Sequence, residues 1–234
     1  MQLFYNSEIK KSDKTFFFDK EESKHIVKVL RKKEGDKVFI TNGLGYLFES
    51  EIIMTSEKKC EVKITEETFQ EPNTFYTHIA VAPTKMNDRL EWFLEKATEI
   101  GIHEITPIIC DHSERKVYKI DRAEKIIQAA MKQSLHYYIP KINEPVSLSQ
   151  FIKSNITGQK FIAHCEETDK KSFKNEVKRD EKITILIGPE GDFSTKEINF
   201  AIENKFIPVT LGNTRLRTET AALVACHTIA LINE

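Results

Sequence analysis

Residues 183–229 of the chain read ITILIGPEGDFSTKEINFAIENKFIPVTLGNTRLRTETAALVACHTI, and this stretch decides the fold. Its first five residues are apolar and mostly β-branched, which is typical of a strand buried on both faces. A glycine loop follows at 188–191, and a second apolar run, 206–211, ends at Gly212. Because glycine permits backbone conformations that other residues avoid, each run is predicted to be a strand that ends in a tight loop.

Helices are predicted after both strands. Ser194 and Glu197 have the spacing of a capping box, so a helix should begin near residue 195. The predicted helix 220–232 is apolar on nearly every side, whereas a surface helix shows only an apolar stripe. We therefore expect this last helix to be buried in the core or in a subunit interface. Two glycine loops at successive strand ends are also typical of a ligand crevice in an α/β sheet.

The same stretch resembles a known family. IGPEGDFSTKE followed by LGNTRLRTETAALVA is similar to the signature of the bacterial 16S rRNA uridine-N3 methyltransferases, the ribosomal RNA small subunit methyltransferase E family of the SPOUT superfamily. The family loop reads Gly-Pro-Glu-Gly-Gly, and Asp192 stands at its last position here. The resemblance implies a C-terminal α/β methyltransferase domain that contains a deep trefoil knot and binds S-adenosylmethionine.

The rest of the second domain, predicted to span residues 74–234, also alternates strands with helices. This alternation indicates a parallel α/β sheet. Neither the Gly-x-Gly-x-x-Gly fingerprint nor the Walker phosphate loop is present. The two common nucleotide-binding motifs are therefore excluded. Further strands are predicted at 78–82, 104–109 and 160–165, and helices are predicted to be capped by Asp88 with Glu91, by Asp121 with Glu124 and by Ser147 with Gln150.

The first domain, residues 1–70, is predicted to be a small β-barrel joined to the second by a polar linker at 66–74. A helix is expected at 21–33 with Gly35 as its stop, and Asn42-Gly43-Leu44-Gly45 is a strong hairpin signal. HIVKVLRKKEGDKVFITNG resembles the PUA-like RNA-binding domain of the same family. The strands are expected at 15–18, 37–41, 46–53 and 60–65.

A basic edge is predicted along the helix of the first domain. Lys24, Lys28, Arg31 and Lys32 recur at spacings of three and four residues, as on one side of a helix. Two interpretations remain open, a solvated helix face and a surface that contacts RNA phosphates.

Composition bears on partners and location. The chain has 234 residues, a formal net charge of −1 and four scattered cysteines without metal-type spacing, which predicts free thiols and no metal. No signal peptide or membrane-spanning run is recognised, so we expect a cytoplasmic protein without a membrane partner. The near-neutral charge argues weakly against a nucleic-acid partner, but it does not exclude a local basic patch.

The family resemblance implies the positions of the cofactor and the RNA. The cofactor would lie on backbone groups of three strand-end loops. Further family-like segments at 85–91, 112–116 and 131–136 imply RNA contacts by Arg89, Gln133 and Ser134 and a functional role for Arg115, whereas Lys132 and His136 depart from the family pattern. The expected cofactor residues are His164, Cys165, Glu166, Gly188, Pro189, Glu190, Gly191, Leu211, Gly212 and Leu216.

Methyl transfer to uracil N3, the reaction implied by the resemblance, requires side chains that promote loss of the N3 proton and stabilise the resulting charge. Uracil N3 must lose its proton before it can attack a methyl group, and a fixed cation would stabilise the charge that spreads onto the carbonyl oxygens. Arg217 is the first candidate for this cation and Arg115 the second. Glu219 or Glu190 could accept the proton, and the sequence does not decide between them.

The substrate and assembly are likewise implied by resemblance. They would be one uridine near the 3′ end of 16S rRNA in an assembled small (30S) subunit, methylated by a homodimer packed through the helix 220–232. Two alternatives remain open: a SPOUT methyltransferase for another rRNA or tRNA position, and a non-catalytic RNA-binding protein.

Overall fold

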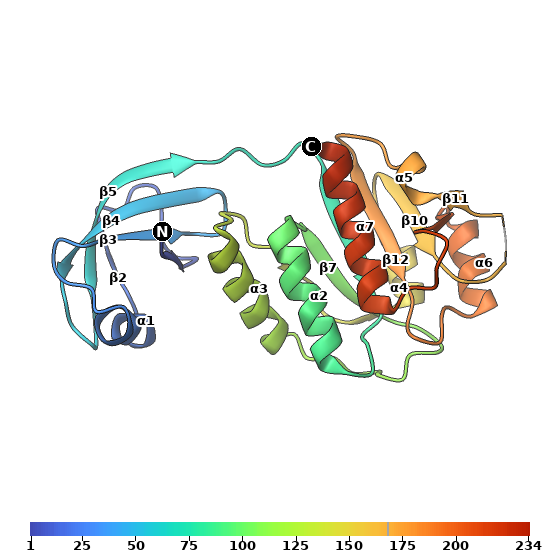
Figure 1. Cartoon of the computed structure of the whole chain (residues 1–234), viewed down its shortest axis with the longest axis horizontal. Coiled ribbons are helices and arrows are strands. Elements are labelled where there is room, and N and C mark those ends of the chain that lie inside the picture. Colours follow the sequence, from blue (N-terminus) through green and yellow to red (C-terminus); the bar gives the residue numbers. More distant parts are fainter. Residues whose placement is uncertain (168) are drawn as a thin grey trace. The chain divides into compact units, whose positions relative to one another are not determined.

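The computed structural model describes residues 1–167 and 169–234, and its contacts divide the chain into two units (Figure 1). The first unit comprises Met1–Pro72 and Met131–Ile139, and the second comprises Asn73–Ala130 and Pro140–Glu234. The sequence places residues 131–139 inside a continuous second domain, but in the structure they pack with the first unit.

Main-chain hydrogen bonds explain this assignment of Met131–Ile139. Gly45 N–H donates to the Tyr137 carbonyl at 2.9 Å, and Ile139 N–H donates to the Gly43 carbonyl at 3.0 Å. The hairpin glycines thus offer backbone groups to a segment that is distant in sequence.

The first unit is built on one sheet with strand order β1-β3-β4-β5-β2. All pairs are antiparallel except the parallel pair of β1 and β3. Its core is a cluster of apolar side chains from the strands and from the helical segment after β2, including Phe4, Ile26 and Phe48. The strands are β1 (Leu3–Tyr5), β2 (Thr15–Phe17), β3 (Lys37–Thr41), β4 (Tyr46–Met54) and β5 (Glu61–Phe69).

The predicted helix 21–33 is wrong in its length and type. The α-helix α1 covers only Lys20–Lys24, and a π-helical turn, η1, follows at His25–Val29. Arg31 then adopts a left-handed conformation with φ of 53°, which ends the helix before Gly35. The β-branched residues in this segment lower its helix propensity. The four basic residues therefore do not share one helical edge as predicted.

The hairpin predicted around Gly43 is confirmed, because β3 and β4 pair with each other. The linker between the two domains, predicted at 66–74, begins later than predicted. Strand β5 continues to Phe69, which pairs with Tyr46 of β4. Residues 66–69, predicted to be linker because they are polar, are therefore strand residues. Cross-strand pairing decided their structure against a composition that favours a loop.

The second unit holds a parallel sheet with strand order β11-β13-β10-β12-β6-β7-β8, and β9 pairs with β7. Strand β12 lies between β10 and β6, and its last five residues are buried, as predicted for the run 183–187. The carboxyl ends of β10, β12 and β13 meet at one edge of the sheet. The strands are β6 (Tyr76–Val81), β7 (Glu104–Ile109), β8 (Lys141–Ile142), β9 (Val146–Ser147), β10 (Gln159–Ala163), β11 (Lys171–Ser172), β12 (Lys182–Ile187) and β13 (Ile207–Thr210).

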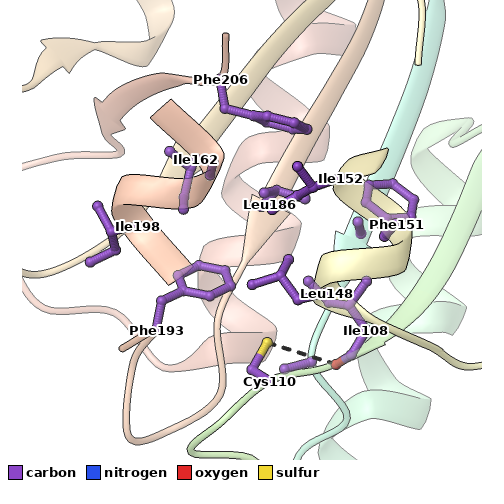
Figure 2. Close-up of a cluster of buried hydrophobic side chains, with 13 residues drawn as sticks. Ile108, Cys110, Leu148, Phe151, Ile152, Ile162, Leu186, Phe193, Ile198 and Phe206 are labelled. Carbon is purple, nitrogen blue, oxygen red and sulfur yellow. Dashed lines mark hydrogen bonds between the residues drawn. The ribbon is translucent and has the colours of Figure 1, made fainter. Parts of the chain in front are cut away.

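Helices cover both faces of this sheet. Helices α4 and α6 pack over the face that carries Ile162 and Leu186, where Phe193 and Phe206 complete a buried cluster (Figure 2). Helices α2 and α7 pack against each other, and α7 also contacts β6 and β12 (Figure 1). The helices are α2 (Asn87–Ile100), α3 (Asp121–Ser134), α4 (Leu148–Lys153), α5 (Phe173–Glu176), α6 (Thr195–Glu203) and α7 (Thr218–Asn233).

Two of the predicted capping boxes are confirmed. Ser194 accepts a hydrogen bond from Glu197 N–H at 3.3 Å, and the Glu197 carboxylate accepts from Ser194 N–H at 2.9 Å. Ser147 and Gln150 form the second box, at the start of α4. The box predicted at Asp88 is wrong, because the N-cap of α2 is Met86, two residues earlier, and it makes no side-chain hydrogen bond.

Candidate active site

The loops after β10 and β12 and the segment before α7 enclose a cavity of about 310 Å³. Small-molecule sites commonly measure about 300–1,000 Å³. Its wall combines apolar side chains, carboxylates and two arginines. The lining residues are Ala163, Cys165, Ile187, Gly188, Pro189, Glu190, Asp192, Arg215, Leu216, Arg217, Thr218 and Ala221.

A smaller cavity of about 90 Å³ shares part of this wall. It extends toward the loop after β13, so that the ends of three parallel strands contribute to one crevice. Its own lining residues are His164, Val209, Thr210, Leu211, Gly212 and Thr214.

Most of the residues that the sequence assigns to a cofactor meet in this crevice. Cys165, Gly188, Pro189, Glu190 and Leu216 line the larger cavity, and His164, Leu211 and Gly212 line the smaller one. In the described part of the chain, Glu166 and Gly191 line neither cavity, although both stand beside residues that do. The sequence did not identify Asp192, Arg215 or Thr218, although all three lie within the two motif segments.

Gly188 joins the glycine loop to the last helix. Its carbonyl accepts a hydrogen bond from Thr218 Oγ1 at 3.0 Å, and Thr218 is the first residue of α7. A Cβ atom at Gly188 would lie 3.0 Å from Cδ2 of the buried Phe193. A side chain at this position would therefore require Phe193 to shift by a few tenths of an ångström.

Gly212 holds the second glycine loop in a different way. Its φ of +149° is rarely adopted by residues with a side chain, and nothing lies within 4 Å of its Cβ position. Its carbonyl accepts from Thr210 Oγ1 at 2.7 Å. Backbone conformation, rather than crowding, favours glycine here.

His164 is a polar residue without a partner beside the crevice. Its side chain is 7% exposed, and neither ring nitrogen has a hydrogen-bond partner among the described residues. Burial and then the nearby Lys170 ammonium lower the pKa of His164 from its usual value. An unsatisfied buried donor or acceptor costs about 1–3 kcal/mol, so this ring fits a polar ligand or an ordered water nearby.

Arg115 and Glu190 lie in one network around the segment after β6. Arg115 donates to the carbonyl oxygens of Thr84 at 3.2 Å and Lys85 at 2.8 Å. Lys85 N–H in turn donates to Glu190 Oε1 at 3.0 Å. The guanidinium of Arg115 therefore holds backbone in place and is not a free cation in the cavity.

Glu219 lies in the first turn of α7, beside Arg89 of α2. Its Oε1 is 4.0 Å from Arg89 Nε, its side chain is 8% exposed, and its Oε2 has no hydrogen-bond partner among the described residues. The arginine and the positive end of the helix dipole both favour a negative charge here. Glu219 does not belong to the wall of either cavity.

Arg217 is placed differently from Arg115. It is the N-cap residue of α7 and lines the larger cavity, as does Arg215. Within the described part of the chain, the guanidinium groups of both residues make no hydrogen bond or ion pair. Either group can therefore turn toward a ligand in the cavity.

The residues expected to contact RNA lie partly in the first unit. Lys28 pairs with Glu57 at 3.0 Å, and the Lys32 ammonium donates to the Lys37 carbonyl at 3.3 Å. Lys24 and Arg31 make no side-chain contact of this kind with the described residues. Gln133 and Ser134 end helix α3, in the segment that packs with the first unit.

Two kinds of feature are not found in the described part of the chain. Residues 1–167 and 169–234 contain no group of histidine, cysteine and carboxylate side chains placed to hold a metal ion. The same residues form no helix with the length and apolar character needed to cross a membrane.

Comparisons with known proteins support one family. Residues 71–230 match the family model of the RNA methyltransferase domain, and residues 18–65 match that of the RNA methyltransferase PUA domain. Ribosomal RNA small subunit methyltransferase E of Buchnera aphidicola is 33% identical over 220 residues, which cover 90% of this chain and 85% of that protein.

Solved structures agree with this assignment. The crystal structure of a probable rRNA-methyltransferase from Porphyromonas gingivalis is 38% identical, has a TM-score of 0.92, and is matched over 100% of this chain and 98% of the other. A methyltransferase of Legionella pneumophila, solved with its bound cofactor S-adenosylmethionine, is 27% identical with a TM-score of 0.88, over 99% and 97% of the two chains. The chain therefore belongs to the ribosomal RNA small subunit methyltransferase E family, with an N-terminal PUA domain and an α/β SPOUT methyltransferase domain.

Proposed function

We propose that this protein methylates N3 of one uridine in 16S rRNA of the small ribosomal subunit, with S-adenosylmethionine as methyl donor. The observation that carries the proposal is the crevice at the carboxyl ends of β10, β12 and β13, built from the two family motifs. The Legionella relative binds S-adenosylmethionine within the same fold.

The crevice fits a ligand with adenosine and amino-acid parts. Ala163, Ile187, Leu216 and Ala221 provide apolar surface, and the glycine loops expose backbone groups. The ring of His164, which has no hydrogen-bond partner among the described residues, adds a polar group beside the smaller cavity. The residues that would hold the cofactor are therefore those of the three strand-end loops. When bound, S-adenosylmethionine supplies an electrophilic methyl group on a sulfonium.

Arg217 is the residue proposed to stabilise the reacting base. Methyl transfer is an in-line displacement, so the protein contributes mainly alignment and electrostatic stabilisation. A cation in the cavity wall favours the uracil anion that forms when N3 loses its proton. Arg217 can act in this way because its side chain is not engaged elsewhere in the described chain, whereas Arg115 is bound to two carbonyl groups.

The two candidate proton acceptors have other roles in the structure. Glu190 lines the cavity, but one of its oxygens holds the Lys85 amide. Glu219 lies beside Arg89 and outside the cavity wall. We therefore propose that Glu190 is an anchor for the segment after β6. The positive charge of Arg217 then lets the N3 proton pass to solvent water.

The RNA must present the base outside a helix. Uracil N3 is hidden in a Watson–Crick pair, so the target has to be unpaired or turned out of its stack. A chain with a net charge of −1 gains little affinity from bulk charge and depends on local basic groups. We propose that Lys24, Lys28, Arg31 and Lys32 contact phosphates, and that Arg89, Gln133 and Ser134 also contact the RNA.

The assembly and the location follow from the same proposal. One side of α7 is exposed and carries Leu231, which is 58% exposed, and the exposed His227 one turn earlier. We propose that this side packs against α7 of a second copy to form a homodimer. We also propose a cytoplasmic location, because the proposed substrate is part of the small ribosomal subunit. The proposal requires no metal ion.

Reverse transcription tests the proposed product. A methyl group on N3 blocks base pairing, so cDNA synthesis on 16S rRNA should stop at the modified uridine. Small subunits from cells that lack the protein should lose this stop, and incubation with purified protein and S-adenosylmethionine should restore it. A stop that persists without the protein would refute the assignment, and a lost stop at another rRNA or tRNA position would identify a different target.

A further inference from the structure

Asp192 ends the glycine loop in a conformation that few residues adopt. Its φ is +61°, in the left-handed region, and its N–H donates to the Pro189 carbonyl at 2.9 Å. Aspartate tolerates this region better than most residues with a side chain, although less well than glycine. The loop therefore keeps a tight turn while it carries a carboxylate at this point.

The carboxylate of Asp192 joins two loops of the crevice. Its Oδ2 accepts a hydrogen bond from Cys165 N–H at 2.7 Å, and its Oδ1 accepts from Phe193 N–H at 2.9 Å. Cys165 follows β10, whereas Asp192 follows β12, the neighbouring strand. Asp192 and Cys165 both line the larger cavity, so this hydrogen bond lies in the cavity wall.

Other contacts hold the same loop from outside the cavity. Thr195 Oγ1 donates to Glu166 Oε1 at 2.7 Å, and the Lys170 ammonium donates to the carbonyl oxygens of His164 and Glu166 at 3.0 and 2.7 Å. Neither Thr195 nor Lys170 belongs to the cavity wall. Among these contacts, the one from Asp192 joins two residues that both line the larger cavity.

We propose that Asp192 is a positioning residue for the cofactor. Its carboxylate fixes the Cys165 amide and so sets the loop 164–166 against the glycine loop before the cofactor binds. The inference rests on the proposed use of S-adenosylmethionine. Preorganisation of this kind raises affinity because less conformational freedom is lost on binding. A glycine at 192 would allow the same turn but would leave the two loops unconnected.

Three substitutions separate this role from general stabilisation. Asp192→Gly keeps the backbone conformation accessible and removes both side-chain hydrogen bonds. Asp192→Asn tolerates the left-handed conformation, but its single carbonyl oxygen replaces only one of the two acceptors. Thr195→Val is the matched control, since it removes a contact to the same loop outside the cavity.

The experiment measures binding of S-adenosylmethionine and of S-adenosylhomocysteine by calorimetry, together with kcat on small subunits and the melting temperature. For Asp192→Gly, both ligands should bind about tenfold more weakly, which corresponds to the loss of one charge-assisted hydrogen bond. The value of kcat at saturating cofactor should change by less than about threefold, because the methyl-transfer step itself is not altered. Asp192→Asn should lie between wild type and Asp192→Gly, and Thr195→Val should bind both ligands almost as the wild type does.

Several results would overturn the inference. Wild-type affinity in Asp192→Gly would show that the bridge is not needed. An equal loss of affinity in Thr195→Val, with a matching fall in melting temperature, would show a purely structural role. A loss confined to S-adenosylmethionine would indicate instead a charge contact with its sulfonium. If the wild-type protein bound neither ligand, the proposed function would fail together with the inference, whereas a wild type that binds and an unaffected Asp192→Gly would refute the inference alone.

Discussion

The backbone N–H of Lys85 donates a hydrogen bond to Oε1 of Glu190 at 3.0 Å. Lys85 follows β6 and Glu190 follows β12, so the contact joins the loops of two adjacent parallel strands. Arg115 donates to the carbonyl of the same Lys85 at 2.8 Å. Lys85, Arg115 and Glu190, which belong to separate sequence motifs, thus form one hydrogen-bonded support that holds the loop after β6 at the edge of the crevice.

This support predicts different effects for two substitutions of Glu190. Glu190→Gln keeps an oxygen that can accept from Lys85 N–H, so its turnover should stay within about threefold of wild type. Glu190→Ala leaves the amide without this acceptor and should lower cofactor affinity, by about 1 kcal/mol or more for one lost hydrogen bond. Calorimetry and single-turnover methylation measure the two effects. A loss of turnover of about a hundredfold or more in Glu190→Gln would instead identify Glu190 as the general base.

Arg217→Ala should separate catalysis from cofactor binding. We expect turnover to fall roughly a hundredfold or more, as for removal of one donor to a developing oxyanion, while the affinity for S-adenosylmethionine changes little. Arg215→Ala is the matched control, because it removes the same charge from the same cavity wall and should reduce turnover less. Parallel losses of cofactor affinity and turnover in Arg217→Ala would contradict the proposed division of roles.

Gly188→Val and Gly212→Val should both abolish cofactor binding, but for different reasons. Gly188→Val should abolish cofactor binding and lower the melting temperature, because its Cβ would meet Phe193 at 3.0 Å and displace the core. Gly212→Val has open space at its Cβ but a φ of +149°, so binding should be lost with a smaller effect on stability. Calorimetry and thermal unfolding distinguish the cases. A Gly188→Val protein with wild-type affinity would show that the glycine loop is not part of the cofactor site.

Sequence patterns were most informative in the second unit. Continuous apolar runs and capping boxes identified β12, α6 and α7 closely, because parallel strands are buried on both faces and helix caps are local in sequence. Most of the crevice residues also lie within the two family motifs. The trefoil knot stays a prediction, since no local pattern encodes the threading of a chain.

Contacts between distant segments explain what the sequence did not reveal. The bond between Asp192 and Cys165 spans 27 residues and depends on the order of the strands. The extension of β5 to Phe69 depends on its pairing with Tyr46, although the composition there favours a linker. The π-helical turn at His25–Val29 likewise replaces a helix that periodicity alone would extend. Tertiary contacts decided the first two cases, whereas β-branched residues that lower helix propensity account for the third.

Acid should destabilise the second unit through two histidines. Burial lowers the pKa of His103 to about 4, and burial also lowers that of His78 to about 4 against the opposing charge of Glu104. The unfolded chain, with a histidine pKa of about 6.5, binds more protons than the folded chain below that pH, so stability should fall progressively from pH 6.5 to 4.

Thermal unfolding between pH 7.5 and 4.5 measures this dependence, and we expect a fall in melting temperature on the order of 5 °C or more. His103→Gln should reduce the slope, because glutamine is not protonated in this range and can still accept from Thr77 N–H, the present donor to His103 Nδ1. An unchanged slope in this variant would exclude His103 as a source of the acid sensitivity.

Helix α7 should mediate the association of two copies. Ala222, Ala225 and Ile229 are buried within the chain, whereas Leu231 is 58% exposed on the same helix. An apolar surface of this kind is expected to be covered by a partner. Sedimentation velocity at micromolar concentration should therefore give about twice the chain mass of 27.1 kDa. Leu231→Glu should shift the protein toward the monomer, and Ile202→Glu, the same type of change at an exposed position of α6, should not. A wild-type protein that sediments as a monomer under these conditions would refute the proposed dimer.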